Sequence, residues 1–176
     1  MVKIHRADEI ADFAGCLGDI DDIFFGSSAR RDFCNQEEKQ AFRDISLGRY
    51  IEKHRSSFFV ALKDAGGAVG YLAGCLENPT LNHFNDVGYF RDIDDLCRDY
   101  PAHLHVNVAE GYRNRGLGTA LVGQFVEWAK LHSVRGIHLV TSNTSRSIPF
   151  YRRSGFIELR TFPWNAGTSV CMGRKL

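Results

Sequence analysis

Length, composition and charge limit the classes of protein to which this chain can belong. At 176 residues it is long enough to bury one hydrophobic core, and 44% hydrophobic with 24% charged residues is typical of a globular protein rather than a disordered one. The 22 lysines and arginines almost balance the 21 aspartates and glutamates. This balance gives no support to a nucleic-acid partner, which needs a concentrated basic face.

The cysteines and the apolar runs indicate the compartment. The five cysteines are odd in number and lack CxxC spacing, which predicts free thiols and neither a disulfide framework nor a metal site. Residues 1–5 lack the apolar stretch of a signal peptide, and no run approaches the roughly 18 apolar residues of a membrane span. We therefore expect a cytoplasmic protein with no membrane partner.

The first third of the chain predicts one short strand and two helices. Residues 2–5 alternate as a strand does, and Asp8 is placed to cap a helix whose apolar residues follow at helical spacing. A second helix is predicted over residues 36–50, with Asp32 or Asn35 as its cap.

A hairpin and an irregular segment follow. Residues 57–62 and 68–76 are rich in strand-forming residues, and the glycines of the intervening residues 63–67 supply the positive φ of a tight turn. Residues 77–100 are polar and aromatic and show no clean period beyond one or two helical turns. We interpret this segment as an insertion or lid over the site.

Strands and helices alternate through the rest of the chain, which predicts an α/β (α+β) fold with a mixed sheet. The expected elements are a strand at 103–108, a helix from Gly116 to just before Gly136, a strand at 137–141, a helix at 145–153 and strands at 156–160 and 168–172.

A glycine-containing turn joins the strand at 103–108 to the next helix. Its residues are Arg113, Asn114, Arg115, Gly116, Leu117, Gly118 and Thr119. Such a turn gathers free backbone N–H groups and the positive end of the helix dipole around one point, where an anion binds. The turn therefore predicts a phosphate-bearing ligand, with Arg113 or Arg115 adding charge at the rim; the alternative is that the glycines merely close the turn.

The spacing of the glycines separates the classes of phosphate ligand. A Walker loop requires a lysine after its last glycine, whereas Gly118 is followed by Thr119 and Ala120. A dinucleotide fingerprint requires a third glycine three residues further on, where this chain has Leu121. The spacing therefore disfavours ATP or GTP bound by a Walker loop, and it also disfavours NAD.

Two motifs resemble the GNAT superfamily of N-acetyltransferases. Arg113-x-x-Gly116-x-Gly118 matches its Q/R-x-x-G-x-G/A signature, and residues 150–156 resemble its later Y-x-x-x-G-F segment. The resemblance covers roughly residues 57–162. It implies a single GNAT domain over residues 1–176, with a mixed, mostly antiparallel sheet of about six to seven strands flanked by about four helices.

A narrower resemblance concerns one strand. Residues 100–106 look like the strand in bacterial acetyltransferases related to the acetyltransferase-like domain of O-GlcNAc hydrolases.

The GNAT resemblance implies an acyltransferase with acetyl-CoA as co-substrate. It would transfer the acetyl group to a primary amine by direct attack in a ternary complex, without a metal or a covalent enzyme intermediate. Residues 113–119 would hold the pyrophosphate of coenzyme A. The backbone N–H groups of Val106, Asn107 and Val108 would hold the thioester carbonyl, and Tyr151 would protonate the departing thiolate. Asn143 is a further cofactor-binding candidate, although the family asparagine seven residues before the tyrosine falls on Thr144.

Histidines are the candidates for the general base. His103, His105 and Asn107 share one face of their predicted strand, and His138 lies on the neighbouring strand, where some relatives carry a glutamate. We name His138 and His105, either of which can take the proton of the amine through a water. The alternative is that strand histidines are hydrogen-bonded core residues.

The missing acidic base leaves a second function open. The chain can instead be a non-catalytic acyl-CoA-binding or protein-interaction module that keeps the GNAT fold. The sequence does not identify the acceptor: protein lysine, peptide N-terminus, aminoglycoside, polyamine and amino sugar all remain open. The oligomeric state is also open, and a homodimer is one possibility, because the final strands of such folds sometimes pair between subunits.

Overall fold

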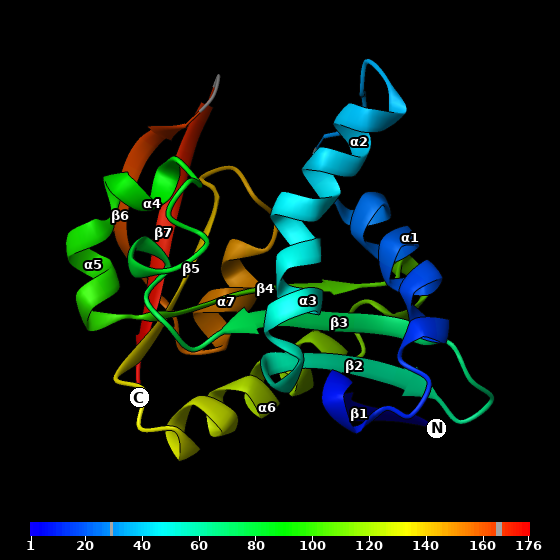
Figure 1. Ribbon diagram of the computed structural model, residues 1–176. Helices are drawn as coiled ribbons and strands as arrows, with labels where there is room; N and C mark the ends of the chain where they lie inside the picture. The colour runs from blue at the N-terminus through cyan, green and yellow to red at the C-terminus, as the bar shows by residue number, and fades with distance from the viewer. Residues whose placement is uncertain (29, 165–166) are drawn as a thin grey trace. The chain divides into compact units, whose positions relative to one another are not determined.

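The computed structural model describes residues 1–28, 30–164 and 167–176 (Figure 1). The chain forms two compact units. Unit 1 comprises residues 1–74 and 105–125, and unit 2 comprises residues 75–104 and 126–176. The strands follow the hydrogen-bonded order β1-β2-β3-β4-β5-β7-β6. Among the strand pairs described by residue, β1–β2, β2–β3, β5–β7 and β6–β7 are antiparallel and β4–β5 is parallel, so the prediction of a mixed, mostly antiparallel α/β sheet is confirmed.

Unit 1 holds three strands of its own and three helices. They are β1 (Val2–Arg6), α1 (Leu17–Ser27), α2 (Gln36–Arg43), α3 (Arg49–Lys53), β2 (Phe58–Lys63) and β3 (Ala68–Cys75). The hairpin of β2 and β3 is confirmed: the amide of Lys63 donates to the carbonyl of Gly67 at 3.1 Å, and Gly66 and Gly67 have φ of 86° and 89°. In Figure 1, α3 crosses the strands of this hairpin and α2 extends away from it; β3 is buried along its whole length.

The first helix begins later than the sequence indicates. Arg6 and Glu9 close a capping box around a short 3₁₀ turn, Ala7–Glu9, and the extended backbone of Ile10 then ends that turn. A second 3₁₀ turn, Ala14–Cys16, leads into α1. The prediction that Asp8 caps the helix was wrong, because Asp8 lies inside this 3₁₀ turn, whose N-cap is Arg6 and which ends at the extended Ile10.

The second predicted helix is present but interrupted. Asn35 is its cap, as predicted, and accepts a hydrogen bond from the amide of Glu38 at 2.8 Å. A π-helical turn, Asp44–Gly48, separates α2 from α3, and the helical path extends to Lys53 rather than to Tyr50. Apolar spacing does not reveal such a turn, because it inserts one residue without changing the buried face elsewhere.

A close contact inside unit 1 makes Gly74 sensitive to substitution. A Cβ at this position would lie 2.2 Å from the ring of Phe125, which is fully buried and packs edge-on against Phe59 with the centroids 6.4 Å apart. We expect Gly74→Ala to lower the free energy of unfolding by about 2–3 kcal/mol in urea titrations. Gly18→Ala is the control, since a Cβ there meets no atom within 4 Å. Equal stability of the two variants would contradict this packing.

Unit 2 holds most of the second half of the chain, and β4 and α6 belong to both units. The elements are α4 (Tyr89–Asp92), α5 (Asp94–Asp99), β4 (Ala102–Val108), α6 (Leu117–Leu131), β5 (Gly136–Ser142), α7 (Ile148–Arg153), β6 (Ile157–Trp164) and β7 (Gly167–Lys175). Strand β7 lies between β5 and β6, and buried side chains of β5 and β7 form much of the core of this unit.

Several boundaries in this unit differ from the prediction. Helix α6 ends at Leu131 rather than just before Gly136, which instead begins β5; Ser133, with φ of 56°, takes the left-handed conformation after the helix. Helix α7 begins at Ile148 rather than at Ser145. The physical reason is that the hydroxyl of Ser145 accepts the amide of Ser147 at 3.2 Å, a local turn that competes with the helix.

Residues 77–100 are anchored within unit 2. The segment contains a 3₁₀ turn, Pro79–Leu81, as well as α4 and α5. Phe84, Phe90, Ile93 and Cys97 are all buried, and the rings of Phe84 and Phe90 pack against His103 at 4.8 Å and 5.2 Å between centroids. These anchors favour a fixed insertion over a moving lid.

Among the residues that the structure describes, no helix combines the length and the apolar character that crossing a membrane requires.

Candidate functional site

The predicted phosphate turn is a strand–turn–helix element of unit 1. Strand β4 ends at Val108, a 3₁₀ turn (Glu110–Tyr112) follows, and α6 begins at Leu117. Asn114 and Gly116 have positive φ, 59° and 79°, so the chain reverses direction sharply before the helix. Residues 113–116 are exposed, which leaves the turn open to a ligand.

Free backbone N–H groups point out of this turn. The first backbone hydrogen bond of the helix runs from the amide of Ala120 to the carbonyl of Gly116, at 3.0 Å. Over the described part of the chain, the amides from Gly116 to Thr119 have no hydrogen-bond acceptor. Unsatisfied amides at the positive end of a helix dipole form an anion site, and a phosphate group satisfies several of them at once.

Arg113 holds the turn in place. Its Nε donates to the carbonyl of Val108 at 2.9 Å, and its guanidinium also donates to the hydroxyl of Ser27, the last residue of α1, at 3.2 Å. Both acceptors are neutral, and within the described residues Arg113 forms no ion pair with a carboxylate. The guanidinium of Arg115 lies over the ring of Tyr112 at 5.7 Å. The sequence predicts the charge of these arginines but not the contact with Ser27, which is 86 residues away.

The second half of β4 is tied to β3 within unit 1. The amide of Ala109 donates to the carbonyl of Val69 at 2.9 Å, and the side-chain amide of Asn107 donates to the hydroxyl of Tyr71 at 2.8 Å. The β4–β5 ladder contains Ala102 and His103 but, among the described residues, none from His105 to Val108. Within the described residues, Val106 to Val108 therefore take no part in the β4–β5 ladder.

His105 is a neutral imidazole between two tyrosines of unit 1. Its ring meets Tyr50 and Tyr71 edge-on, at 5.3 Å and 5.6 Å between centroids. Its Nε2 is buried and has no hydrogen-bond partner among the described residues. Burial lowers the pKa of His105 from its ordinary value near 6.5 to about 4, since desolvation penalises the charged form.

His138 is a core residue of unit 2. It is 1% exposed, its Nδ1 donates to the carbonyl of Tyr100 at 2.5 Å, and its Nε2 lies 3.9 Å from the sulfur of Cys97. Burial lowers the pKa of His138 to about 4, and the bond to Tyr100 opposes that shift only partly. Because both ring nitrogens have partners in a packed environment, the geometry favours a structural role.

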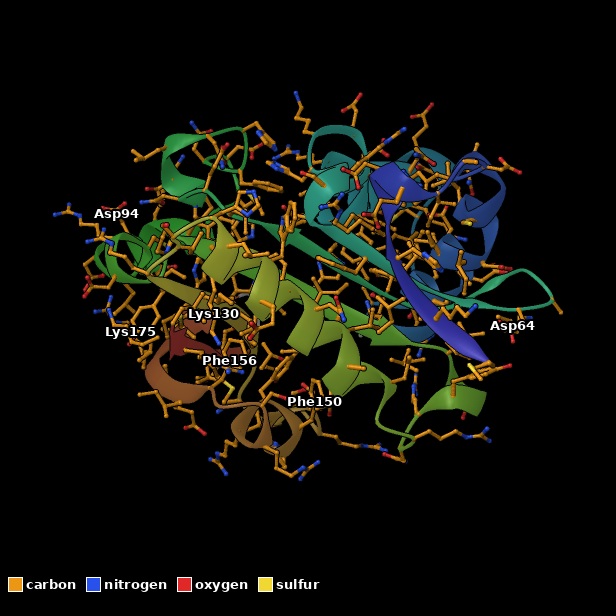
Figure 2. The ribbon with its side chains drawn as sticks, turned by 90° about the horizontal axis from the view of Figure 1, so that it is seen from below. Asp64, Asp94, Lys130, Phe150, Phe156 and Lys175 are labelled. Atoms are coloured by element: carbon orange, nitrogen blue, oxygen red, sulfur yellow. The ribbon has the colours of Figure 1, made fainter. Side chains whose placement is uncertain are left out.

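Tyr151 and Asn143 are also in unit 2. The ring of Tyr151 packs against the rings of Phe150 on α7 and of Phe156 just after that helix, at 4.9 Å and 6.0 Å between centroids; Figure 2 labels both phenylalanines. Burial raises the pKa of Tyr151, so its hydroxyl keeps its proton. Over the described residues this hydroxyl has no hydrogen-bond partner, yet its oxygen is not fully buried. Asn143 is exposed, and its backbone amide donates to the backbone carbonyl of Thr168 at 3.0 Å.

The two buried histidines predict a pH-dependent stability. The folded chain keeps His105 and His138 neutral down to about pH 4, whereas the unfolded chain protonates them below pH 6.5. The unfolded state therefore binds more protons in this window, and acidification destabilises the fold by about 2 kcal/mol per histidine between pH 7 and pH 5. Urea unfolding at the two pH values measures this loss. His138→Phe and His105→Phe should each remove about half of it, and an unchanged pH dependence in both would contradict the burial of the rings.

The predicted residues fall into two groups, one in each unit. His105 to Val108 and Arg113 to Thr119 lie on consecutive elements of unit 1, while His138, Asn143 and Tyr151 lie in unit 2. Sequence reasoning missed Tyr50 and Tyr71, and it did not foresee the contact of Ser27 with Arg113; all three residues contact the first group. No motif marks them, because each belongs to an element distant in sequence. In the described residues, no three His, Cys, Asp or Glu side chains are placed to share a metal ion.

A strand, an exposed glycine turn with free amides and an amphipathic helix form an arrangement that is able to bind a phosphate group in an α/β protein. Residues 21–156 match the model of the acetyltransferase (GNAT) family, which is most of the chain. The chain belongs to the acetyltransferase (GNAT) family.

Solved structures share the fold over nearly the whole chain. The structure of SsHAT is 20% identical with a TM-score of 0.75, and the match covers 99% of this chain and 98% of that one. PH1933 from Pyrococcus horikoshii OT3 is 15% identical, with a TM-score of 0.72 and coverages of 100% and 99%. A chain of the NatC complex, solved bound to Gag peptide and CoA, is 13% identical, with a TM-score of 0.67 and coverages of 99% and 98%.

Proposed function

We propose that this chain is an acetyl-CoA-dependent N-acetyltransferase that transfers the acetyl group to a primary amine by direct attack. The observation that carries the proposal is the exposed turn of unit 1, whose amides from Gly116 to Thr119 lack acceptors in the described structure, in a chain of the acetyltransferase (GNAT) family. The absence of a Walker lysine and of a third dinucleotide glycine favours coenzyme A over ATP, GTP and NAD.

We assign the binding of acetyl-CoA to the residues that the sequence predicts for it. The pyrophosphate accepts hydrogen bonds from the amides of Gly116 to Thr119, and the charges of Arg113 and Arg115 add to the helix dipole. The amides of Val106 to Val108 hold the thioester carbonyl and stabilise the oxyanion that forms on it. Asn143 is assigned to cofactor binding on the family resemblance.

The reaction forms one bond and breaks another. The lone pair of the neutral amine attacks the thioester carbon, a C–N bond forms, and the tetrahedral intermediate collapses with loss of the C–S bond. The amine gives up a proton to a base, and the departing thiolate takes one from the hydroxyl of Tyr151. Burial raises the pKa of Tyr151, so the phenol is protonated at neutral pH, but the same shift makes it a weaker acid than a thiol, and the proton transfer depends on how the site aligns the two groups.

The base is assigned to His105 rather than to His138. Both are neutral at pH 7, but His138 has partners at both ring nitrogens, whereas Nε2 of His105 has none among the described residues. Burial makes His105 a weak base, with a pKa of about 4. Because so weak a base is a poor acceptor for the proton of an amine, a second candidate function remains: a non-catalytic acyl-CoA-binding or protein-interaction module.

The test is a thiol-release screen. Acetyl-CoA is incubated with the protein and a panel of amines: a lysine peptide, a peptide N-terminus, an aminoglycoside, a polyamine and an amino sugar. The enzyme hypothesis expects free thiol above the uncatalysed rate with at least one amine. Tight acetyl-CoA binding with no release across the panel would favour the non-catalytic module.

Three further assignments belong to the same proposal. We assign residues 1–176 to a single N-acetyltransferase domain with residues 77–100 as its insertion, and we expect it in the cytoplasm. A closer relation to acetyltransferases that resemble the domain of O-GlcNAc hydrolases is supported by residues 100–106 alone.

A further inference from the structure

A hollow of about 460 Å³ lies at the start of α2 and the end of α1, within unit 1. This volume is in the range of small-molecule sites. Its lining residues are Phe25, Gly26, Arg30, Arg31, Phe33, Asn35, Gln36 and Lys39. Three of them are cationic, two are aromatic and none is acidic.

The aromatic wall is continuous. The rings of Phe25 and Phe33 meet edge-on at 6.1 Å between centroids, and Phe24 and Phe42 support them from behind at 5.0 Å and 5.4 Å. Phe24 is buried, whereas Phe25 and Phe33 are only partly buried. The wall therefore offers apolar surface to a ligand that has a flat or aliphatic body.

One of the three cationic side chains, Arg30, is neutralised by an ion pair. Arg30 forms an ion pair with Glu38, and the other carboxylate oxygen of Glu38 accepts the amide of Cys34 at 2.6 Å. The hydrogen bond from Cys34 and the Arg30 guanidinium hold the pKa of Glu38 below its usual range. The charge of Arg30 is thus balanced by the carboxylate of Glu38.

The other two cations have no carboxylate partner in the described structure. The guanidinium of Arg31 donates to the carbonyls of Phe25 and Gly26 at 2.9 Å and 3.0 Å, and these neutral acceptors fix its position without cancelling its charge. The ammonium of Lys39 lies 4.4 Å from the centre of the Phe25 ring. Two uncompensated charges therefore border one aromatic hollow, which suits an anion with an apolar body.

The hollow adjoins the proposed cofactor turn through a contact inside unit 1. Ser27, next to the lining residue Gly26, accepts the hydrogen bond from Arg113. We propose that this hollow binds the carboxylate of the acyl acceptor, which is then a primary amine that carries a carboxylate and an apolar body. The identity of the ligand as an acceptor rests on the proposed function, whereas the anion preference of the hollow does not.

Calorimetry with two probes of one shape tests the anion preference. Phenylpropionate carries the carboxylate, and phenylethylamine has the same ring with an amine in its place. We expect the chain to bind phenylpropionate at least about tenfold more tightly, and to lose about tenfold of that affinity in Arg31→Gln/Lys39→Gln. Lys39→Arg should retain it, since the charge is kept. Lys130→Gln is the control, because Lys130 lies on α6 outside the hollow (Figure 2).

Two outcomes overturn the proposal. Equal affinity for the two probes, or no loss in the double variant, removes the anion site. Displacement of phenylpropionate by adenosine bisphosphate would show that the hollow takes a phosphate of the cofactor and would overturn its assignment to the acceptor. Titration with coenzyme A separates the two proposals: if the double variant binds coenzyme A as the parent does, a failure of the hollow leaves the proposed function standing. If the parent binds phenylpropionate but not coenzyme A, the proposed function fails together with the assignment of the ligand as an acceptor, and the anion preference of the hollow stands.

Discussion

Gly118→Leu should weaken the binding of acetyl-CoA by about 100-fold or more in calorimetry. In a helix the Cα–Cβ bond tilts toward the N-terminus, so a leucine side chain at this position would lie over the free amides at the start of α6. It would exclude the pyrophosphate from those amides. The fold itself should remain intact, since the position is in the first turn of the helix and is only partly buried.

Gly123→Leu is the matched control for this substitution. Gly123 lies on the same helix, it is exposed, and a Cβ there meets no atom within 4 Å. We expect its affinity for acetyl-CoA to stay within about twofold of the parent. If both variants bind acetyl-CoA like the parent, the cofactor does not use the start of α6 and the site assignment fails.

Tyr151→Phe should slow thiol release by about 100-fold or more while changing the affinity for acetyl-CoA by less than about twofold. The substitution removes only the hydroxyl, which has no hydrogen-bond partner among the described residues, so the packing of the ring against Phe150 and Phe156 is kept. A loss of rate without a loss of binding is the signature of a group that acts on the departing thiolate.

Tyr89→Phe controls for the loss of a buried phenol. Tyr89 lies on α4 of unit 2, and burial raises its pKa as it does that of Tyr151. This variant should release thiol at nearly the parent rate. Parallel losses of rate and affinity in Tyr151→Phe would instead show a packing role, and a normal rate would remove Tyr151 from the mechanism.

The phosphate turn was predictable because its signals are local. Gly116 must adopt a positive φ, the apolar face of α6 begins immediately afterwards, and both features are contained within a few residues. The hairpin at Gly66 and Gly67 was predictable for the same reason. Such elements need no knowledge of distant contacts.

The surroundings of the turn were not predictable because they depend on long-range packing. Arg113 reaches Ser27 across 86 residues, and Asn107 reaches Tyr71 across 36. The same holds for the choice between His105 and His138. The two look equivalent in the sequence, and only the hydrogen bonds of His138 to Tyr100 and Cys97 separate them.

The most direct test of the central claim compares two ligands that share the reactive arm. Pantetheine carries the thiol of coenzyme A but lacks its pyrophosphate. If the turn from Arg113 to Thr119 holds that pyrophosphate, the parent chain should bind coenzyme A at least about 100-fold more tightly than pantetheine, and Gly118→Leu should lose this difference while its affinity for pantetheine is unchanged. Equal affinity of the parent for both ligands would contradict the account.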